Sequence, residues 1–499
     1  MGIPSYFSYI IKNYSNIIRN IEYFIKNQIS FDSLYMDCNS IIYDSAHFLE
    51  KEHPEIKEED FEDVLIKMVI KKMEDYIFFI KPKKMVYMAF DGVAPMGKME
   101  QQRKRRYMSL IISKLPLPEN KASKFNTVLI TPGTKFMDKF SDIIEKHFLK
   151  NDEKFGVERL ILSSPNEPGE GEHKIFHYMK NNSEYVKNDI VALYGLDSDL
   201  IMLSLLHLYR VNNIHIFREA PEFIKSAIPI NSYKPSDLYF LDVLKLCKGI
   251  VTEMDDNCDM TRINDYVFIS FFLGNDFLPS MIGMNLRGSG MLIIMKAYKK
   301  KKEKVIKEGG KIDWKSVKSV LCEISKNEEE EIKKEYEERE KKEKRYKNVS
   351  EEEKVRNLGI IKREKEKYIN PLERGWEERY KKVIGYKEED KKLYKKKLKS
   401  VWKYYMLKGN ENRKKVKSVL VKWLLEDEEG EEEEEEEEEE VIEKEKQKRY
   451  IFPKETLEMI GELKEGESKE ENVEYEYIMK RYIWEGEVKI HNKKCDSIV

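Results

Sequence analysis

Paired cysteines, long apolar runs and a dominant charge of one sign are all missing from this sequence. Its five cysteines form no C-x-x-C pair, which argues against a zinc site and a disulfide framework and fits a reducing compartment. No run of 18 apolar residues occurs, and residues 1–7 lack the features of a signal peptide, so we expect no membrane span. We expect a cytoplasmic protein, with the nucleus as the alternative. The 91 Lys and Arg residues nearly balance the 93 Asp and Glu residues, so any basic surface for nucleic acid must be local.

Short apolar runs that end in acidic residues are the main feature of residues 1–295. Such runs end at Asp37, Asp91 and Asp197, and runs of four to eight apolar residues are typical of strands buried on both faces. Longer amphipathic stretches at 61–80 and 138–149 lie between them. Strands that alternate with helices predict an α/β fold with a mostly parallel central sheet flanked by helices.

The composition changes after residue 295. Of residues 331–370, 25 are charged, which favours a highly charged helical or mobile insertion over 296–370. Aromatic residues return between 376 and 423, and they indicate a helix that docks on the rest of the chain rather than one that stacks on RNA. The acidic stretch 426–447 predicts a disordered linker, and the aromatic residues that follow it predict a tail, 448–499, that packs back onto the core.

Carboxylates gather at the ends of the predicted strands and in the loops between them. Ligands of open α/β sheets bind beyond the carboxyl ends of the strands, so these acids would converge on one edge. Two pairs share an i, i+2 spacing, and an extended chain would place Asp197 and Asp199 on one face. The candidate acids are Asp37, Asp91, Glu170, Glu172, Asp197, Asp199 and Asp276.

Seven carboxylates need a counter-charge to share one pocket. A pair about 4 Å apart repels by about 4 kcal/mol at an effective dielectric of about 20. Oxygen ligands of this kind are those that Mg²⁺ or Mn²⁺ prefer. Two ions about 3.5–4 Å apart would let one activate water and the other stabilise the departing oxygen of a phosphodiester. Any one acid taken alone is more often a helix N-cap, but seven in this order favour a metal site.

A basic segment begins seven residues after Asp91. Its residues Lys98, Gln102, Arg105 and Arg106 have the spacing i, i+4, i+7, i+8, which places them on one face of a helix. Arginine binds phosphate oxygens through two parallel hydrogen bonds, and lysine supplies a point charge. The alternative is a solvated basic face that pairs with glutamates. The proximity to Asp91 favours a site for a terminal phosphate.

These segments together resemble the Xrn-type 5′→3′ exoribonucleases, which are related to the flap endonucleases and PIN-like nucleases. The matching motifs cover residues 1 to about 295 in order: MGIPSYF (1–7), D-x-N-x-I-I (37–42), FDGVAP (90–95), K-M-x-Q-Q-R-x-R-R (98–106), I-T-P-G-T-x-F-M (130–137), PGEGEHK (168–174), G-L-D-x-D-L-I-M-L (195–203) and GNDFLP (274–279). The family's second conserved region is matched more weakly, within 371–425 and 448–499.

The resemblance implies hydrolysis of 5′-monophosphorylated single-stranded RNA to 5′-mononucleotides in RNA decay, with two Mg²⁺ ions or with Mn²⁺ in their place. It implies that the seven acids hold the metal and, with Lys98, form the catalytic set. It also implies that Lys98, Gln102, Arg105 and Arg106 bind the 5′-phosphate. The family's usual Gly and His are replaced by Ser40 and Tyr43, and Tyr43 would stack on a base.

Two other functions remain as alternatives. A structure-specific flap endonuclease acting on DNA uses a similar acid cluster, and internal incision of a 5′-flap would favour it. A non-catalytic RNA-binding scaffold would bind RNA without turnover, although a scaffold has little reason to keep so much uncompensated charge together. We expect a monomer that needs no membrane. His173 and His177 are expected on a polar helix face rather than as zinc ligands.

Overall fold

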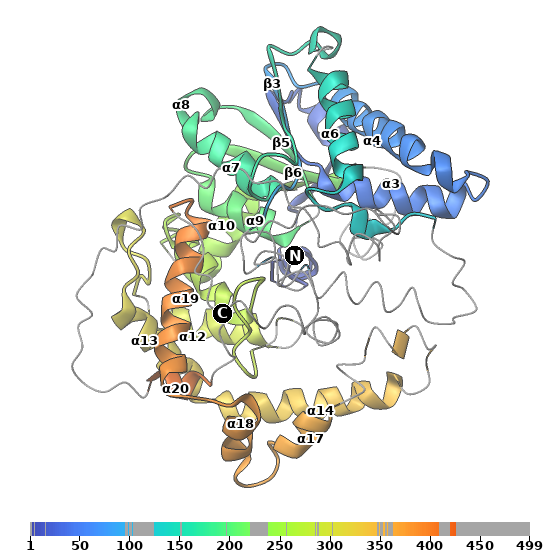
Figure 1. The fold of residues 1–499 in the computed structure, drawn as a ribbon. Helices are drawn as coiled ribbons and strands as arrows, with labels where there is room; N and C mark the ends of the chain where they lie inside the picture. Colours follow the sequence, from blue (N-terminus) through green and yellow to red (C-terminus); the bar gives the residue numbers. More distant parts are fainter. Residues whose placement is uncertain are drawn as a thin grey trace.

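A computed structural model of the protein has a seven-stranded sheet as its central layer (Figure 1). The structure describes residues 2–3, 5–14, 16–94, 98, 102, 124–149, 152–195, 197–219, 238–255, 257–284, 286, 289–301, 303–346, 349, 353–354, 357, 363–408 and 420–425. The strands are β1 Ile18–Asn20, β2 Ser33–Asp37, β3 Met85–Ala89, β4 Arg159–Ser163, β5 Ile190–Tyr194, β6 Asn213–Glu219 and β7 Leu238–Asp242.

The sheet is mostly parallel. Its strand order is β1-β7-β6-β5-β2-β3-β4. The five strands from β6 to β4 run parallel to one another, while β7 pairs antiparallel with β6 and β1 pairs antiparallel with β7. This confirms the predicted fold class, and it brings the carboxyl ends of β2, β3 and β5 to the same edge of the sheet.

The central strands are buried on both faces, as their unbroken apolar runs predict. Every residue of β2 and of β3 is buried. Alternate side chains enter different cores, so that Leu34 and Met36 pack on one side of the sheet and Tyr35 on the other. The three predicted strands are therefore confirmed, and β3 and β5 end a few residues before Asp91 and Asp197.

Helices cover both faces of the sheet (Figure 1). Helices α3, α4 and α6 pack on one face, and α7, α9 and α10 pack on the other. The predicted helices at 61–80 and 138–149 are present as α4 and α6, which begin a few residues earlier. The helices of this part are α1 Tyr6–Asn13, α2 Ile21–Lys26, α3 Asn39–Glu52, α4 Glu58–Ile80, α6 Lys135–Phe148, α7 Gly171–Asn181, α8 Ser183–Val186, α9 Ser198–His207 and α10 Val243–Met254, with 3-10 turns η1 Thr127–Leu129 and η2 Asp152–Phe155.

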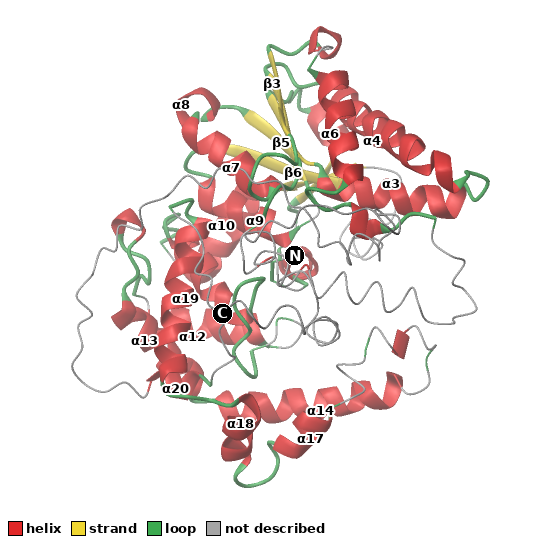
Figure 2. Cartoon of the chain, viewed as in Figure 1, coloured by secondary structure: helices red, strands yellow, loops and turns green. Residues whose placement is uncertain are grey.

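After β7 the described chain is mostly helical (Figure 2). Its elements are α11 Arg262–Ser270, η5 Phe271–Leu273, α12 Gly290–Lys301, η6 Glu308–Gly310, α13 Trp314–Ser325, α14 Glu328–Tyr346, α17 Glu364–Ile369, α18 Trp376–Ile384, α19 Glu389–Tyr405 and α20 Val421–Leu425. Helices α11, α12, α13 and α19 contribute to the same apolar core as α7, α9 and α10. The two halves of the chain thus share a core.

The charged region contains a packed helix. Within α14, Ile332 and Tyr336 are buried although most of the helix is charged. The Arg363 side chain is fully buried, donates to the Tyr336 carbonyl oxygen over 3.2 Å and pairs with Glu343 and Glu366. Residues 328–346 of this region are therefore helical and packed, whereas the division of the chain at 296–370 stays a prediction.

Helix α19 docks on the body of the protein, as its aromatic residues predict. The Trp402 Nε1–H donates to the Gly310 carbonyl oxygen over 2.8 Å, and the Trp402 ring stands perpendicular to Phe268 with centroids 5.7 Å apart. Trp402 is 2% exposed, so its ring is closed to an RNA base. None of the described helices has the length and apolar character needed to cross a membrane. The predicted acidic linker 426–447 and the tail 448–499 lie outside the described residues.

Candidate metal centre

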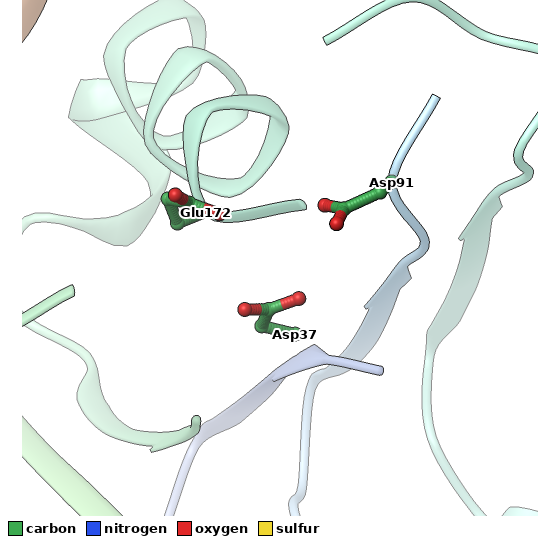
Figure 3. Close-up of side chains that lie close together, drawn as sticks. All are labelled: Asp37, Asp91 and Glu172. Carbon is green, nitrogen blue, oxygen red and sulfur yellow. The ribbon is translucent and has the colours of Figure 1, made fainter. Parts of the chain in front are cut away.

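Strands β2 and β3 deliver the first two acids. These strands are parallel neighbours, with Asp37 in register with Ala89, and Asp91 follows two residues after Ala89. Both carboxylates therefore emerge at the carboxyl edge of the sheet, and Figure 3 shows them pointing toward each other and toward Glu172 from α7. The convergence follows from strand order rather than from closeness in sequence.

Asp91 is held in place by two neighbouring segments. Asn39 Nδ2 donates to Asp91 Oδ2 over 2.8 Å, and the Asp91 N–H donates in return to Asn39 Oδ1 over 3.1 Å. The Gly171 N–H donates to Asp91 Oδ1 over 2.8 Å. A Cβ atom at position 171 would lie 2.5 Å from Asp37 Oδ1, so any side chain there would have to displace this carboxylate.

The two i, i+2 acid pairs lie at helix N-termini. Glu170 and Asp197 precede the first residues of α7 and α9, and Glu172 and Asp199 lie in the first turns. Neither Glu170 nor Asp197 caps its helix with its side chain, although this was the alternative role for such an acid. The partial positive charge of each helix N-terminus favours these carboxylates. The expectation of an extended chain from Asp197 to Asp199 is wrong, because the helix begins between them.

Three of the acids form a compact group suited to a cation. Oxygen atoms of Asp37, Asp91 and Glu172 lie within 4.8 Å of one another. Asp37 Oδ1 is buried and accepts no hydrogen bond from the described residues. Burial and the charges of Asp91 and Asp197 raise the pKa of Asp37 well above its usual value. A buried carboxylate oxygen without a donor, among like charges, fits a divalent cation.

Lys98 is the counter-charge of four acids, one of which, Glu172, also belongs to the group of three. Its Nζ lies 2.6 Å from Glu170 Oε1 and 3.0 Å from Asp276 Oδ2. Glu172 Oε1 and Asp199 Oδ2 follow at 3.6 and 3.8 Å. Burial opposes the ammonium charge, but the four carboxylates outweigh it and raise the pKa of Lys98 well above its usual value. Lys98 is therefore a charged member of the acid cluster.

The structure thus brings all seven predicted acids together. Asp197 is close enough to Asp37 to raise its pKa, and the turn after Gly274, where φ is +83°, carries Asp276 to Lys98. Gln102 has helical backbone conformation. Arg105 and Arg106 lie outside the described residues. Tyr43 is partly buried on α3, with its hydroxyl 3.4 Å from the Ile130 carbonyl oxygen, and its contact with a base stays a prediction.

Sequence reasoning missed two tyrosines at this site. The Tyr404 hydroxyl donates to Glu170 Oε2 over 2.8 Å, and the Tyr405 hydroxyl donates to Asp199 Oδ1 over 2.5 Å. Both belong to the aromatic residues at 376–423 that predict a docking helix, and no spacing links them to acids more than 200 positions earlier. The prediction that His173 lies on a polar helix face is also wrong. His173 is buried, and its ring stacks on Tyr404 with centroids 3.7 Å apart.

Lys174 and Gly2 also lie at the site, although neither is a candidate from the sequence. Lys174 Nζ donates to the carbonyl oxygens of Phe90 and Ser164 over 2.8 and 2.9 Å, and so ties α7 to the loop that carries Asp91. Burial lowers the pKa of Lys174 to about 8. At Gly2, a Cβ atom would lie 2.3 Å from Asp199 Oδ1. Gly2 belongs to the MGIPSYF motif, and a glycine at this position is the sequence feature that could have indicated a close approach of residues 1–7 to the site.

A mostly parallel α/β sheet with acids gathered at its carboxyl edge, followed by a helical region, defines the class of PIN-like nucleases. Comparison with protein families narrows this class. Residues 1–220 match the model described as the XRN 5′-3′ exonuclease N-terminus, and residues 257–484 match the Xrn1 helical domain. The chain belongs to the Xrn-type 5′→3′ exoribonuclease family.

Named relatives agree with this membership. The chain is 32% identical over 343 residues to 5′-3′ exoribonuclease 1 of Saccharomyces cerevisiae, an alignment that covers 63% of this chain and 22% of the relative. It is 29% identical over 403 residues to 5′-3′ exoribonuclease 2 of Eremothecium gossypii, covering 68% and 42%. For the 5′-3′ exoribonuclease 2 homolog of Caenorhabditis elegans the identity is 28% over 381 residues, covering 60% and 38%. The chain spans less than half the length of these relatives.

Proposed function

We propose that this protein is a 5′→3′ exoribonuclease that hydrolyses 5′-monophosphorylated single-stranded RNA to 5′-mononucleotides in RNA decay. The observation that carries the proposal is the compact group of Asp37, Asp91 and Glu172, next to the acids around Lys98, with a buried oxygen of Asp37 that accepts no hydrogen bond from the described residues. The single positive charge of Lys98 offsets only part of the repulsion among so many carboxylates. Family membership supplies the type of reaction.

We propose that the acid cluster holds two divalent cations, Mg²⁺ with Mn²⁺ as a substitute. Asp37, Asp91 and Glu172 would hold one ion. The acids of the second ion would be Glu170, Asp197, Asp199 and Asp276. Bound ions of this type activate water and stabilise the charge that develops on a phosphodiester. The residues of the chain hold the carboxylates in place, through Asn39 and the backbone of Gly171.

The 5′-phosphate would be bound beside this cluster. The Lys98 ammonium group lies against Glu170 and Asp276 and would supply positive charge to a phosphate bound next to these acids. Gln102, Arg105 and Arg106 follow on the same predicted helix face and would complete the phosphate site. Tyr43 would stack on an unpaired base. The selection of a 5′-monophosphate would come from these four polar residues.

The proposal also includes the organisation of the chain. Residues 1–295 would form the nuclease domain, and 296–370 the charged insertion. Residues 371–425 and 448–499 would form a reduced second region, joined by the linker 426–447. We propose a cytoplasmic, monomeric enzyme.

The test uses three RNAs that differ only at the 5′ end, with a monophosphate, a triphosphate or a hydroxyl. In Mg²⁺ we expect rapid release of 5′-mononucleotides from the monophosphate RNA, slow decay of the other two, and no decay in a chelator. Asp197→Ala combined with Asp199→Ala should abolish release with little change in the thermal unfolding midpoint, because removing repelling carboxylates leaves no core cavity.

Each contrary result has a distinct meaning. Equal decay of the three RNAs would contradict the phosphate site. Internal incision of a DNA 5′-flap would favour a flap endonuclease, and RNA binding without turnover in Mg²⁺ or Mn²⁺ would favour a scaffold.

A further inference from the structure

The C-terminal end of α19 reaches the acid cluster from the second half of the chain. Its last two residues, Tyr404 and Tyr405, direct their hydroxyls to different acids. Tyr404 donates to Glu170, which precedes α7, and Tyr405 donates to Asp199, in the first turn of α9. One helix end therefore contacts both i, i+2 acid pairs.

The two oxygens of each carboxylate have separate partners. Glu170 Oε2 accepts from Tyr404, while Glu170 Oε1 faces Lys98 Nζ at 2.6 Å. Asp199 Oδ1 accepts from Tyr405, while Asp199 Oδ2 lies 3.8 Å from the same ammonium group. In both acids the tyrosine therefore binds one oxygen and leaves the other oxygen on the side of the Lys98 ammonium group.

Both tyrosines remain donors in this setting. Each hydroxyl lies within hydrogen-bond distance of a carboxylate oxygen, and an ionised carboxylate only accepts, so the tyrosine is the donor in both bonds. The charge-assisted bond then favours one orientation of the acid.

The rings are fixed by their surroundings, so the hydroxyls have little freedom. Tyr404 stacks on His173 with centroids 3.7 Å apart and meets Phe277 edge-on at 5.1 Å. Tyr405 packs against Phe271 with centroids 4.9 Å apart. The helix is itself anchored by the bond from Trp402 to the Gly310 carbonyl oxygen.

We propose that Tyr404 and Tyr405 are positioning residues that orient Glu170 and Asp199 so that one oxygen of each is presented to a divalent cation. The metal centre would then be completed by a helix of the second region. This inference rests on the proposed function. Partners that orient metal ligands typically contribute 10–100-fold to metal affinity.

The test compares Tyr404→Phe and Tyr405→Phe with Tyr394→Phe in the full chain. Tyr394 is a matched control, because it is buried on the same helix and its hydroxyl has no hydrogen-bond partner among the described residues. Each protein, free of RNA, is titrated with Mn²⁺, and unbound ion is measured by electron paramagnetic resonance. We expect binding about tenfold weaker in Tyr404→Phe and Tyr405→Phe, and unchanged in Tyr394→Phe.

Two further measurements separate positioning from packing. Thermal unfolding in a chelator should give similar midpoints for the three variants, since each keeps its ring. Release of mononucleotides should fall in kcat but not in KM for RNA in the first two variants, and excess Mn²⁺ should restore it. Asp199→Asn should show no such rescue.

The possible results distinguish a failure of this inference from a failure of the proposed function. Wild-type Mn²⁺ affinity in Tyr404→Phe and Tyr405→Phe, or an equal loss in Tyr394→Phe, would overturn the inference, as would a wild-type protein that binds no Mn²⁺. A wild-type protein that binds Mn²⁺ but releases no mononucleotides would contradict the proposed function alone, and the difference in affinity among the variants would still support the positioning roles.

Discussion

A methyl group at position 171 would meet the carboxylate of Asp37 at 2.5 Å. Gly171 also donates its N–H to Asp91. The backbone of this one residue therefore lies against both Asp37 and Asp91, two of the acids that would hold an ion. The spacing of the acid cluster is therefore set at the residue scale by the absence of a side chain.

Gly171→Ala should disrupt the metal centre while leaving the fold nearly intact. The added Cβ must displace the Asp37 carboxylate, so we expect mononucleotide release to fall at least tenfold, with a small change in the unfolding midpoint. Asn181→Ala serves as the control, because Asn181 is exposed at the other end of α7. Unchanged RNA cleavage in Gly171→Ala would show that Asp37 has room to move and does not set the geometry.

Residue patterns in the sequence identify the acids but not their orientation. The motifs around Asp37, Asp91 and Asp276 end apolar runs, and this property is local. The partners that orient the acids are not local, since the bonds from Tyr404 and Tyr405 join residues more than 200 positions apart. The residue pattern of a single segment therefore cannot predict hydrogen bonds to a distant segment.

At the scale of elements, the same i, i+2 spacing occurs twice at a helix start. The sequence predicts the strands at 33–37, 85–91 and 190–197 because buried parallel strands are unbroken apolar runs. It does not indicate where a strand gives way to a helix. Helix α9 begins directly after Asp197, so Asp197 and Asp199 are not an extended pair. The helix starts, rather than strand alternation, bring the paired acids together.

The docking of α19 is an element-scale contact with a testable energy. Trp402 is buried against Phe268 and bonded to the Gly310 carbonyl oxygen. Trp402→Ala should reduce the free energy of unfolding by about 3–5 kcal/mol, as for other large buried aromatic residues. It should also reduce mononucleotide release, since the end of α19 would no longer be anchored near Glu170.

The measurement is denaturant unfolding of the full chain together with the RNA assay. Lys403→Ala is the control, because Lys403 is exposed on the same helix, and it should change neither value. A Trp402→Ala protein that is destabilised but cleaves RNA at the wild-type rate would show that the end of α19 stays in place without its anchor.

At the scale of the whole molecule, the acid cluster joins segments that are distant along the chain. Its members come from β2, the loop after β3, the starts of α7 and α9, and the turn near Gly274, and α19 supplies their hydrogen-bond donors. An ion bound there would contact the sheet and, through Tyr404 and Tyr405, the helical half. Its effect on stability should therefore extend over both halves.

Mg²⁺ or Mn²⁺ should raise the unfolding midpoint of the protein relative to a chelator. Burial, together with the repulsion of neighbouring carboxylates, raises the pKa of Asp37 and of Glu172. An ion that offsets this cost of holding charged groups together therefore stabilises the folded state alone. At an ion concentration about 100 times Kd the gain is about 2.7 kcal/mol per site.

Hydrogen exchange should slow in both the sheet and α19. Asp37→Asn should lose much of the gain, whereas Asp63→Asn, at an exposed acid of α4, should keep it. An equal gain in Asp37→Asn would place the ion elsewhere on the molecule.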